Sequence, residues 1–163
     1  VLEYDDVVNQ QREIIYAQRK RILTSPSLKE NIVSMVYDEL DGLVQQHTIE
    51  EYSEDWDVAG LYNAVRTIIP LPATMTSESW RLMEREELME TLHDLVDQHY
   101  EEREQHIGPE ILRQIEKLVM LETVDRLWVR HLTALDSLRV GIGLRAYGQQ
   151  DPLVAYKLSL IHI

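Results

Sequence analysis

The apolar residues of the chain recur at steps of three and four almost throughout, which is the spacing of one face of an α-helix. No stretch alternates apolar and polar residues for long enough to predict a strand, so the pattern predicts an all-α fold. The first helix is predicted to run to about Thr24, and its stripe begins before any clear cap, as if the chain entered partway along a longer helix. The stripe consists of Tyr4, Val8, Gln11, Ile15, Gln18 and Ile22.

A second helix is predicted after the break at Ser25-Pro26-Ser27. Ser27 with Glu30 three residues later has the spacing of a capping box, which opens a helix that runs to about Gln46. Six apolar residues of this helix share one face and are predicted to be buried: Ile32, Met35, Val36, Leu40, Leu43 and Val44.

Two further helices are predicted in the middle of the chain. Residues 57–69 form a short one that Trp56 anchors and that stops at Pro70-Leu71-Pro72. Residues 79–106 form a longer one, which Gly108 ends. Its inward positions are Leu82, Leu88, Leu92, Leu95 and Val96.

The longest helix is predicted over residues 109–142, where Pro109 suits the first turn because its missing N–H would have no partner there. A second apolar line, formed by Leu112, Val119 and Leu127, lies on another face. Two apolar faces on one long helix are typical of a scaffold that contacts several neighbours. The main stripe consists of Leu118, Leu121, Val124, Trp128, Leu132, Leu135, Leu138 and Ile142.

A glycine-flanked loop over residues 143–152 follows, and Leu153 then begins another helix, so the pattern predicts a helical hairpin. Arg145 and Tyr147 lie at its tip, where few core contacts are available. Two interpretations of Tyr147 carry equal weight at this point. Its ring either folds back to cap the hairpin or binds a partner.

Charge divides the chain in a different way. The formal net charge is −13, but the acidic residues are unevenly distributed. Residues 25–108 contain 19 acidic and 5 basic residues, whereas the two flanking segments together contain 10 acidic and 11 basic residues. Such a block is expected either of an inserted domain or of one domain with an acidic face. The acidity argues against nucleic acid as a partner. Cysteine is absent, which excludes disulfides and thiolate sites.

A search for chemistry finds no catalytic, cofactor-binding or metal site in the sequence. Gly141, Gly143 and Gly148 do not have the spacing of a dinucleotide-binding loop, and no phosphate-binding loop motif occurs. Glu90 and His93 form a single Glu-x-x-His, whereas a di-iron bundle needs two. His131 is expected to hydrogen-bond near the core rather than to bind a metal.

Two stretches of the chain, LEYDDVVNQQREIIYAQRKRIL and VMLETVDRLWVRHLTALDSLRVGIGLRAYGQQDPLVAYK, resemble the C-terminal helical region of the SecA preprotein translocase ATPases. The resemblance implies long scaffold helices with an inserted helical wing. Residues 1–24 would be the first part of the scaffold, residues 25–108 the acidic wing, and residues 109–163 the second part, with a truncated two-helix finger. This arrangement would explain the uneven distribution of charge.

The resemblance also implies a function, which is ATP-driven protein export through the Sec membrane channel. ATP and magnesium would belong to the full-length ATPase, and this chain would have no enzymatic activity of its own. The finger loop, with Leu144, Arg145, Tyr147 and Gln149, would contact the preprotein and the channel. Packing between the long helix and the first helix would regulate the ATPase through Trp128, Leu135, Leu138, Tyr4 and Val8.

The implied partners are preprotein polypeptide, the Sec channel and the other domains of the parent ATPase, in the cytoplasm and peripherally at the bacterial inner membrane. A homodimer would cover apolar stripes left exposed in the isolated chain. An alternative is a free-standing helical adaptor whose acidic wing binds a basic protein partner. The uncapped start of the first helix favours the translocase interpretation over this adaptor.

Overall fold

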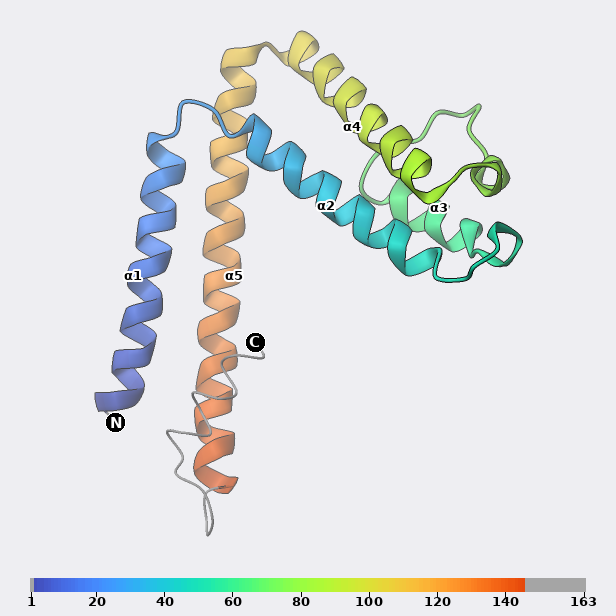
Figure 1. Cartoon of the computed structure of the whole chain (residues 1–163). Coiled ribbons are helices and arrows are strands. Elements are labelled where there is room, and N and C mark those ends of the chain that lie inside the picture. Colours follow the sequence, from blue (N-terminus) through green and yellow to red (C-terminus); the bar gives the residue numbers. More distant parts are fainter. Residues whose placement is uncertain (1, 146–163) are drawn as a thin grey trace. The chain divides into compact units, whose positions relative to one another are not determined.

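The computed structural model describes residues 2–145, and within them the side chains of residues 3–141. All regular secondary structure in this range is helical, which confirms the predicted all-α class (Figure 1). The chain divides into two compact units. Unit 1 comprises Val1–Pro26 and Lys117–Ile163, and unit 2 comprises Ser27–Glu116. No helix in the described range is long and apolar enough to span a membrane.

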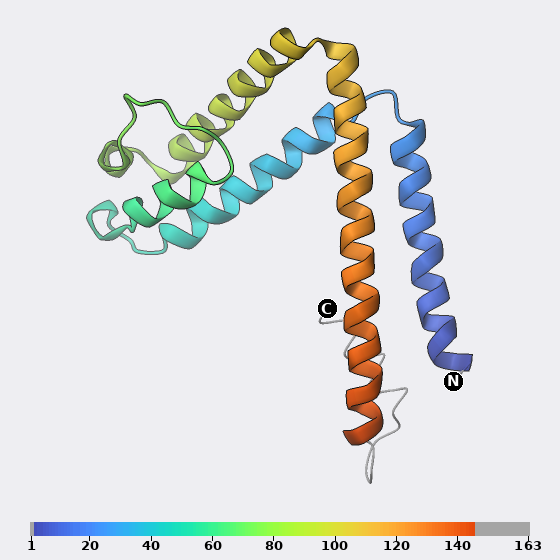
Figure 2. The same cartoon turned by 180° about the vertical axis from the view of Figure 1, so that it is seen from behind.

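Unit 1 is built from α1 (Leu2–Thr24) and the larger part of α5 (Pro109–Arg145). The two helices lie side by side and run in opposite directions, which is also visible from behind (Figure 2). Most of the predicted α1 stripe faces inward, and Ile22 is buried. Gln18 was wrongly placed in it, because Gln18 is exposed and the half-buried neighbour Arg19 forms an ion pair with Asp125 of α5.

Unit 2 contains α2 (Lys29–His47), the 3₁₀ turn η1 (Ser53–Asp55), α3 (Val58–Arg66), the 3₁₀ helix η2 (Ser77–Leu82), α4 (Arg85–Ile107) and the first turns of α5. These elements enclose one apolar core, and Trp56 is buried in it as predicted. The buried core residues are Leu40, Val44, Trp56, Val58, Leu61, Val65, Ile69, Trp80, Leu88, Leu92 and Val96.

The start of α2 differs from the predicted capping box. Leu28 occupies the N-cap position without a side-chain cap hydrogen bond, and the Ser27 hydroxyl accepts from the Lys29 N–H at 3.4 Å rather than from the N–H of Glu30. Leu28 is buried, so apolar packing rather than a polar cap fixes this end of the helix. Met35, predicted to be buried, is exposed because α3 and α4 cover another part of the α2 surface.

The predicted helix over residues 79–106 is two elements. Met83 and Glu84 have extended backbone, which separates η2 from α4. Trp80 of η2 is fully buried, while Leu82, predicted to face inward, is 89% exposed. The Arg81 guanidinium donates to the carbonyl oxygens of residues 53, 54 and 56, which fixes η2 against the loop before α3. This anchoring sets the rotation of η2 and turns Leu82 outward.

The other boundaries lie close to the predicted ones. α3 begins after Asp57, whose carboxylate accepts from the Gly60 N–H at 3.0 Å, and ends at Arg66 rather than Ile69. Gly108, with φ of 96°, ends α4, as predicted, in a conformation that glycine adopts readily. Pro109 begins α5, which continues three residues beyond Ile142.

The predicted main stripe of α5 is only partly covered. Leu135 is buried and most of the other described members are half-buried, but Leu118 is exposed. On the second apolar line Leu112 is buried, whereas Val119 and Leu127 are about half exposed. The loop and second helix of the predicted hairpin lie outside the described residues, apart from the last turn of α5.

Candidate functional site: the paired faces of α1 and α5

The predicted finger-loop contacts fall at the edge of the described range. Leu144 and Arg145 are the last two residues of α5, where only the backbone is described. Tyr147 and Gln149 lie outside the described residues. Contact of these four residues with a polypeptide or a channel therefore stays a prediction.

Four of the five residues predicted for interdomain packing come together in unit 1. Leu135 is 2% exposed, and Tyr4, Val7, Val8 and Leu138 pack around it. We call these five residues the scaffold cluster. The cluster forms because Val7 and Val8 follow Tyr4 by three and four residues and Leu138 follows Leu135 by three, which places one short stripe of each helix against the other.

Arg139 closes one edge of the scaffold cluster. Its guanidinium lies over the Tyr4 ring, 4.9 Å from the centroid, and one nitrogen is 3.6 Å from an Asp5 carboxylate oxygen. The sequence interpretation missed Arg139, although its position four residues after Leu135 places it on the same side of the helix. A cation that stacks on an aromatic ring and also contacts a carboxylate fixes the register of α1 against α5.

Trp128 is not part of the scaffold cluster. It lines a separate apolar groove of about 570 Å³ between α1 and α5. Ile14 and Leu127, which line the same groove, are about half exposed or more. The lining residues are Gln11, Ile14, Ile15, Val124, Leu127, Trp128, Arg130, His131 and Ala134.

Polar contacts along the two helices accompany this groove. His131 Nε2 lies 2.7 Å from the Gln11 side-chain oxygen, and its ring lies 5.7 Å from that of Trp128, so the expected hydrogen bond of His131 is present. Arg19 pairs with Asp125. Lys117 donates to the Leu23 carbonyl at 3.3 Å. These contacts hold α1 and α5 together while leaving the apolar groove open.

The chemistry of this surface suits contact with protein. In the part of the chain that the structure describes, no three His, Cys, Asp or Glu side chains are grouped so that they could hold a metal ion. The groove is apolar, with Gln11, Arg130 and His131 as its polar lining residues. An apolar helix or side chain would bury surface there without leaving a buried polar group unpaired.

The comparison with known proteins identifies the family. Residues 1–161 match the model described as the SecA wing and scaffold domain. The chain belongs to the SecA wing and scaffold family. The resemblance found in the two sequence stretches is thereby confirmed.

Relatives of the SecA family match nearly the whole chain. Proteins named protein translocase subunit SecA are 43% identical over 161 residues in Syntrophomonas wolfei and 44% identical over 158 residues in Syntrophobacter fumaroxidans. Another of that name, from Pelotomaculum thermopropionicum, is 44% identical over 160 residues. These matches cover 98%, 96% and 98% of this chain but only 19%, 19% and 18% of the three SecA proteins.

Proposed function

We propose that this chain is the wing and scaffold part of an ATP-driven translocase that exports proteins through the Sec membrane channel. The observation that carries the proposal is the family match over residues 1–161, together with relatives whose name is protein translocase subunit SecA. ATP and magnesium would bind in other parts of the translocase, and this chain would not hydrolyse nucleotide itself. The whole would work in the cytoplasm and at the inner face of the bacterial inner membrane.

In this proposal residues 1–24 and 109–163 are scaffold and residues 25–108 are the wing. The division into compact units supports it, since the chain passes from unit 1 to unit 2 after Pro26 and returns after Glu116. These points lie two and eight residues beyond the ends at 24 and 108 of the proposed segments. The second difference arises because the first turns of α5 pack with unit 2.

The proposed finger comprises residues 109–163, with Leu144, Arg145, Tyr147 and Gln149 as its contacts with preprotein and channel. The length of α5, which runs unbroken for 37 residues to Arg145, supports a rigid arm that carries a loop. Tyr147 would offer a flat, amphipathic ring that contacts varied polypeptides without requiring a particular sequence.

The proposed regulatory role rests on the contacts between α1 and α5. A movement of the finger helix α5 would shift α1 as well, because the two helices contact each other through the scaffold cluster and through Trp128 in the groove. Residues joined by such packing change arrangement together rather than singly. The other domains of the translocase would then respond to the position of α1, which is how the finger would restrain ATP hydrolysis.

Photocrosslinking from position 147 tests the proposal, in the whole translocase stalled on a translocating preprotein. Glu90, exposed on α4, is the control position. Crosslinks to preprotein from 147 and not from 90 are expected. If position 147 gives no crosslink to preprotein while translocation proceeds, the proposed contact of the finger is wrong. Tyr147 would then be interpreted as a cap of the hairpin.

A further inference from the structure

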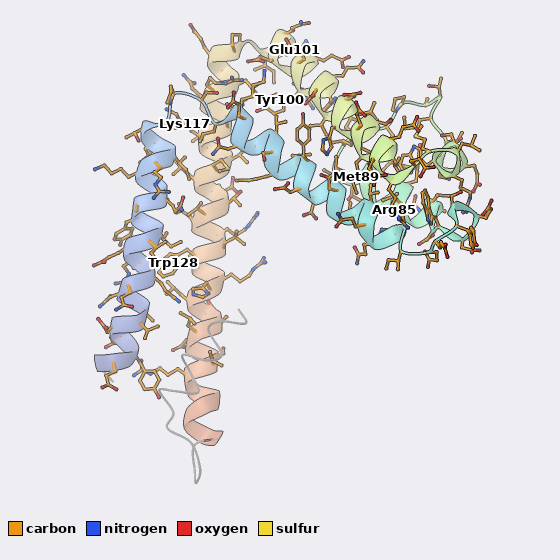
Figure 3. The ribbon with its side chains drawn as sticks, viewed as in Figure 1. Arg85, Met89, Tyr100, Glu101, Lys117 and Trp128 are labelled. Atoms are coloured by element: carbon orange, nitrogen blue, oxygen red, sulfur yellow. The ribbon has the colours of Figure 1, made fainter. Side chains whose placement is uncertain are left out.

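A second polar site lies within unit 2, where the chain enters the unit at Ser27 and leaves it at Glu116. The first turn of α2, the last turns of α4 and the first turns of α5 meet there, and Figure 3 labels Tyr100 and Glu101 on the α4 side. We call its connected side chains the root network. They are Lys29, Tyr100, Glu101, Glu104, Arg113 and Glu116.

Glu116 is the buried centre of the root network. Its carboxylate side chain is only 2% exposed and contacts two polar side chains. The Tyr100 hydroxyl donates to one oxygen, and the other forms an ion pair with Arg113, whose Nε lies 2.8 Å away but makes no hydrogen bond to it. A buried carboxylate is tolerated only where such partners replace water.

The remaining charges share partners. Glu104 lies 2.6 Å from Lys29 Nζ through one oxygen and 2.7 Å from Arg113 Nη2 through the other. Lys29 Nζ is also 3.7 Å from Glu101, and Arg113 Nη1 donates to the Ser27 hydroxyl at 3.4 Å. Lys29, Arg113, Glu104 and Glu116 therefore each contact at least two groups, and Arg113 links the entry and exit points of the chain.

Apolar packing at this place involves few fully buried side chains. The buried members of the unit 2 core, which run from Leu40 to Val96, include no residue of the root network. Near the root the buried apolar side chains among the described residues are Leu28 and Leu112. Charge pairing and the packing of these two side chains therefore hold the three helix ends together, and the charge pairing weakens with salt and with the loss of one partner.

We propose that the root network is a clasp that opens and closes by exchanging ion-pair partners while the apolar core of unit 2 stays packed. Because Arg113 pairs with Glu116 within α5, α2 and α4 can shift at this end without leaving the buried carboxylate of Glu116 alone. Lys29, whose partners are both on α4, is partly exposed, so water can replace them. The pKa directions agree with strong pairing, since hydrogen bonding to Glu104 raises the pKa of Lys29 and the same bond lowers the pKa of Glu104. The proposal rests on this chain alone and stands or falls separately from the translocase function.

Distance measurements between pairs of spin labels test the clasp, because the chain has no cysteine of its own. One pair spans the root, at Asn31→Cys and Glu102→Cys, and another spans the packed part of the unit, at Glu39→Cys and Glu90→Cys; all four positions are exposed on α2 or α4. The distance between the two labels of each pair is measured at low and at high salt in a chain that also carries Glu116→Gln. Glu122→Gln, an exposed position on the same helix, is the matched control.

The expected result is a longer-distance population for the root pair in Glu116→Gln, growing with salt, while the other pair and the Glu122→Gln control do not change. An unchanged root pair would overturn the proposal, and so would broadening of both pairs together. If Glu116→Gln does not fold, Lys29→Gln decides, because it removes one of the two cations at Glu104. The same shift of the root pair is then expected, and its absence would overturn the proposal.

Discussion

The core of unit 2 and the α1–α5 pair of unit 1 are built from helices with the same spacing of apolar residues. The two regions nevertheless bury very different numbers of apolar side chains. Unit 2 has eleven buried residues in one cluster, because α3 and η2 cover the faces that α2 and α4 leave open. In unit 1 the buried apolar residues within the described range are Ile22 and Leu135. Ile14, Leu127, Val129 and Val140 stay exposed by about half or more.

The difference shows what two helices can and cannot do. Each helix of a pair covers one stripe of the other, so a second apolar stripe on either helix needs a third element. Unit 2 supplies those elements itself. Unit 1 has an open apolar groove instead, which a third element could cover.

The largest effect is expected in the unit 2 core. Trp80→Ala removes a fully buried indole and should lower the free energy of unfolding by about 3–5 kcal/mol. Leu82→Ala, two residues away and 89% exposed, should change it by less than about 0.5 kcal/mol. Denaturant unfolding followed by circular dichroism measures both. Similar losses for the two variants would contradict the rotation of η2 described above.

A smaller effect is expected in unit 1. Leu135→Ala should destabilise the α1–α5 pair by about 2 kcal/mol, the low end for a buried leucine, because the scaffold cluster is small. Hydrogen exchange of α1 should accelerate while α3 and α4 stay protected. Leu118→Ala, exposed on the same helix, is the control and should leave α1 unaffected. Faster exchange across both units would mean that they are not separate.

Alkaline pH should weaken unit 2 through two tyrosines. Burial, followed by the hydrogen bond to Asp97, raises the pKa of Tyr37 to about 12, and burial with the bond to Glu116 raises the pKa of Tyr100. A raised pKa in the folded state means that this stabilisation is complete below pH of about 10, the ordinary value of tyrosine, and is lost as pH rises towards 12.

A spectrophotometric titration of the chain should therefore show a late component, which is a group of tyrosines that ionise at a pH above the ordinary value of about 10. Tyr37→Phe should reduce it, while Tyr16→Phe, at an exposed position in unit 1, should leave it unchanged. If the late component survives in both Tyr37→Phe and Tyr100→Phe, these two tyrosines are not its source.

The smallest effect is expected at the edge of the scaffold cluster. Arg139→Gln removes a contact with the Tyr4 ring and a long ion pair with Asp5, both partly exposed, and should cost about 0.5–1 kcal/mol. Added salt should reduce the difference from the parent chain only slightly, because the ring contact is less screened than the ion pair. A cost as large as that of Leu135→Ala would mean that Arg139 rather than Leu135 holds the pair together.

Periodicity predicted the helices well because the spacing of apolar residues within a helix follows directly from its geometry. It could not decide which apolar side chains would be covered. Leu82, Met35 and Leu118 all fit a stripe, but coverage depends on neighbours far away in the sequence. The 3₁₀ form of η2 was missed for the same reason, since it depends on contacts between Arg81 and the backbone of residues 53–56.

The candidate site was predictable only in part. The sequence predicts the packing of Tyr4, Val8, Leu135 and Leu138 through the family resemblance. The groove around Trp128 and the stacking of Arg139 on Tyr4 become visible only in three dimensions. The root network was not predictable, because Lys29 and Glu104 are 75 residues apart and the charged residues of a helix show no periodic pattern that reveals their partners. The contacts proposed for Tyr147 come from family resemblance alone.

If the chain is part of the proposed translocase, other parts of that protein should cover the open groove of unit 1, whereas unit 2 is complete in itself. Hydrogen–deuterium exchange tests it directly, by comparing this chain alone with the same residues in the whole translocase. Peptides from residues 3–24 and 118–141 are expected to gain protection in the whole protein, while peptides from α3 and α4 do not change. Equal exchange of α1 and α5 in both samples would contradict it.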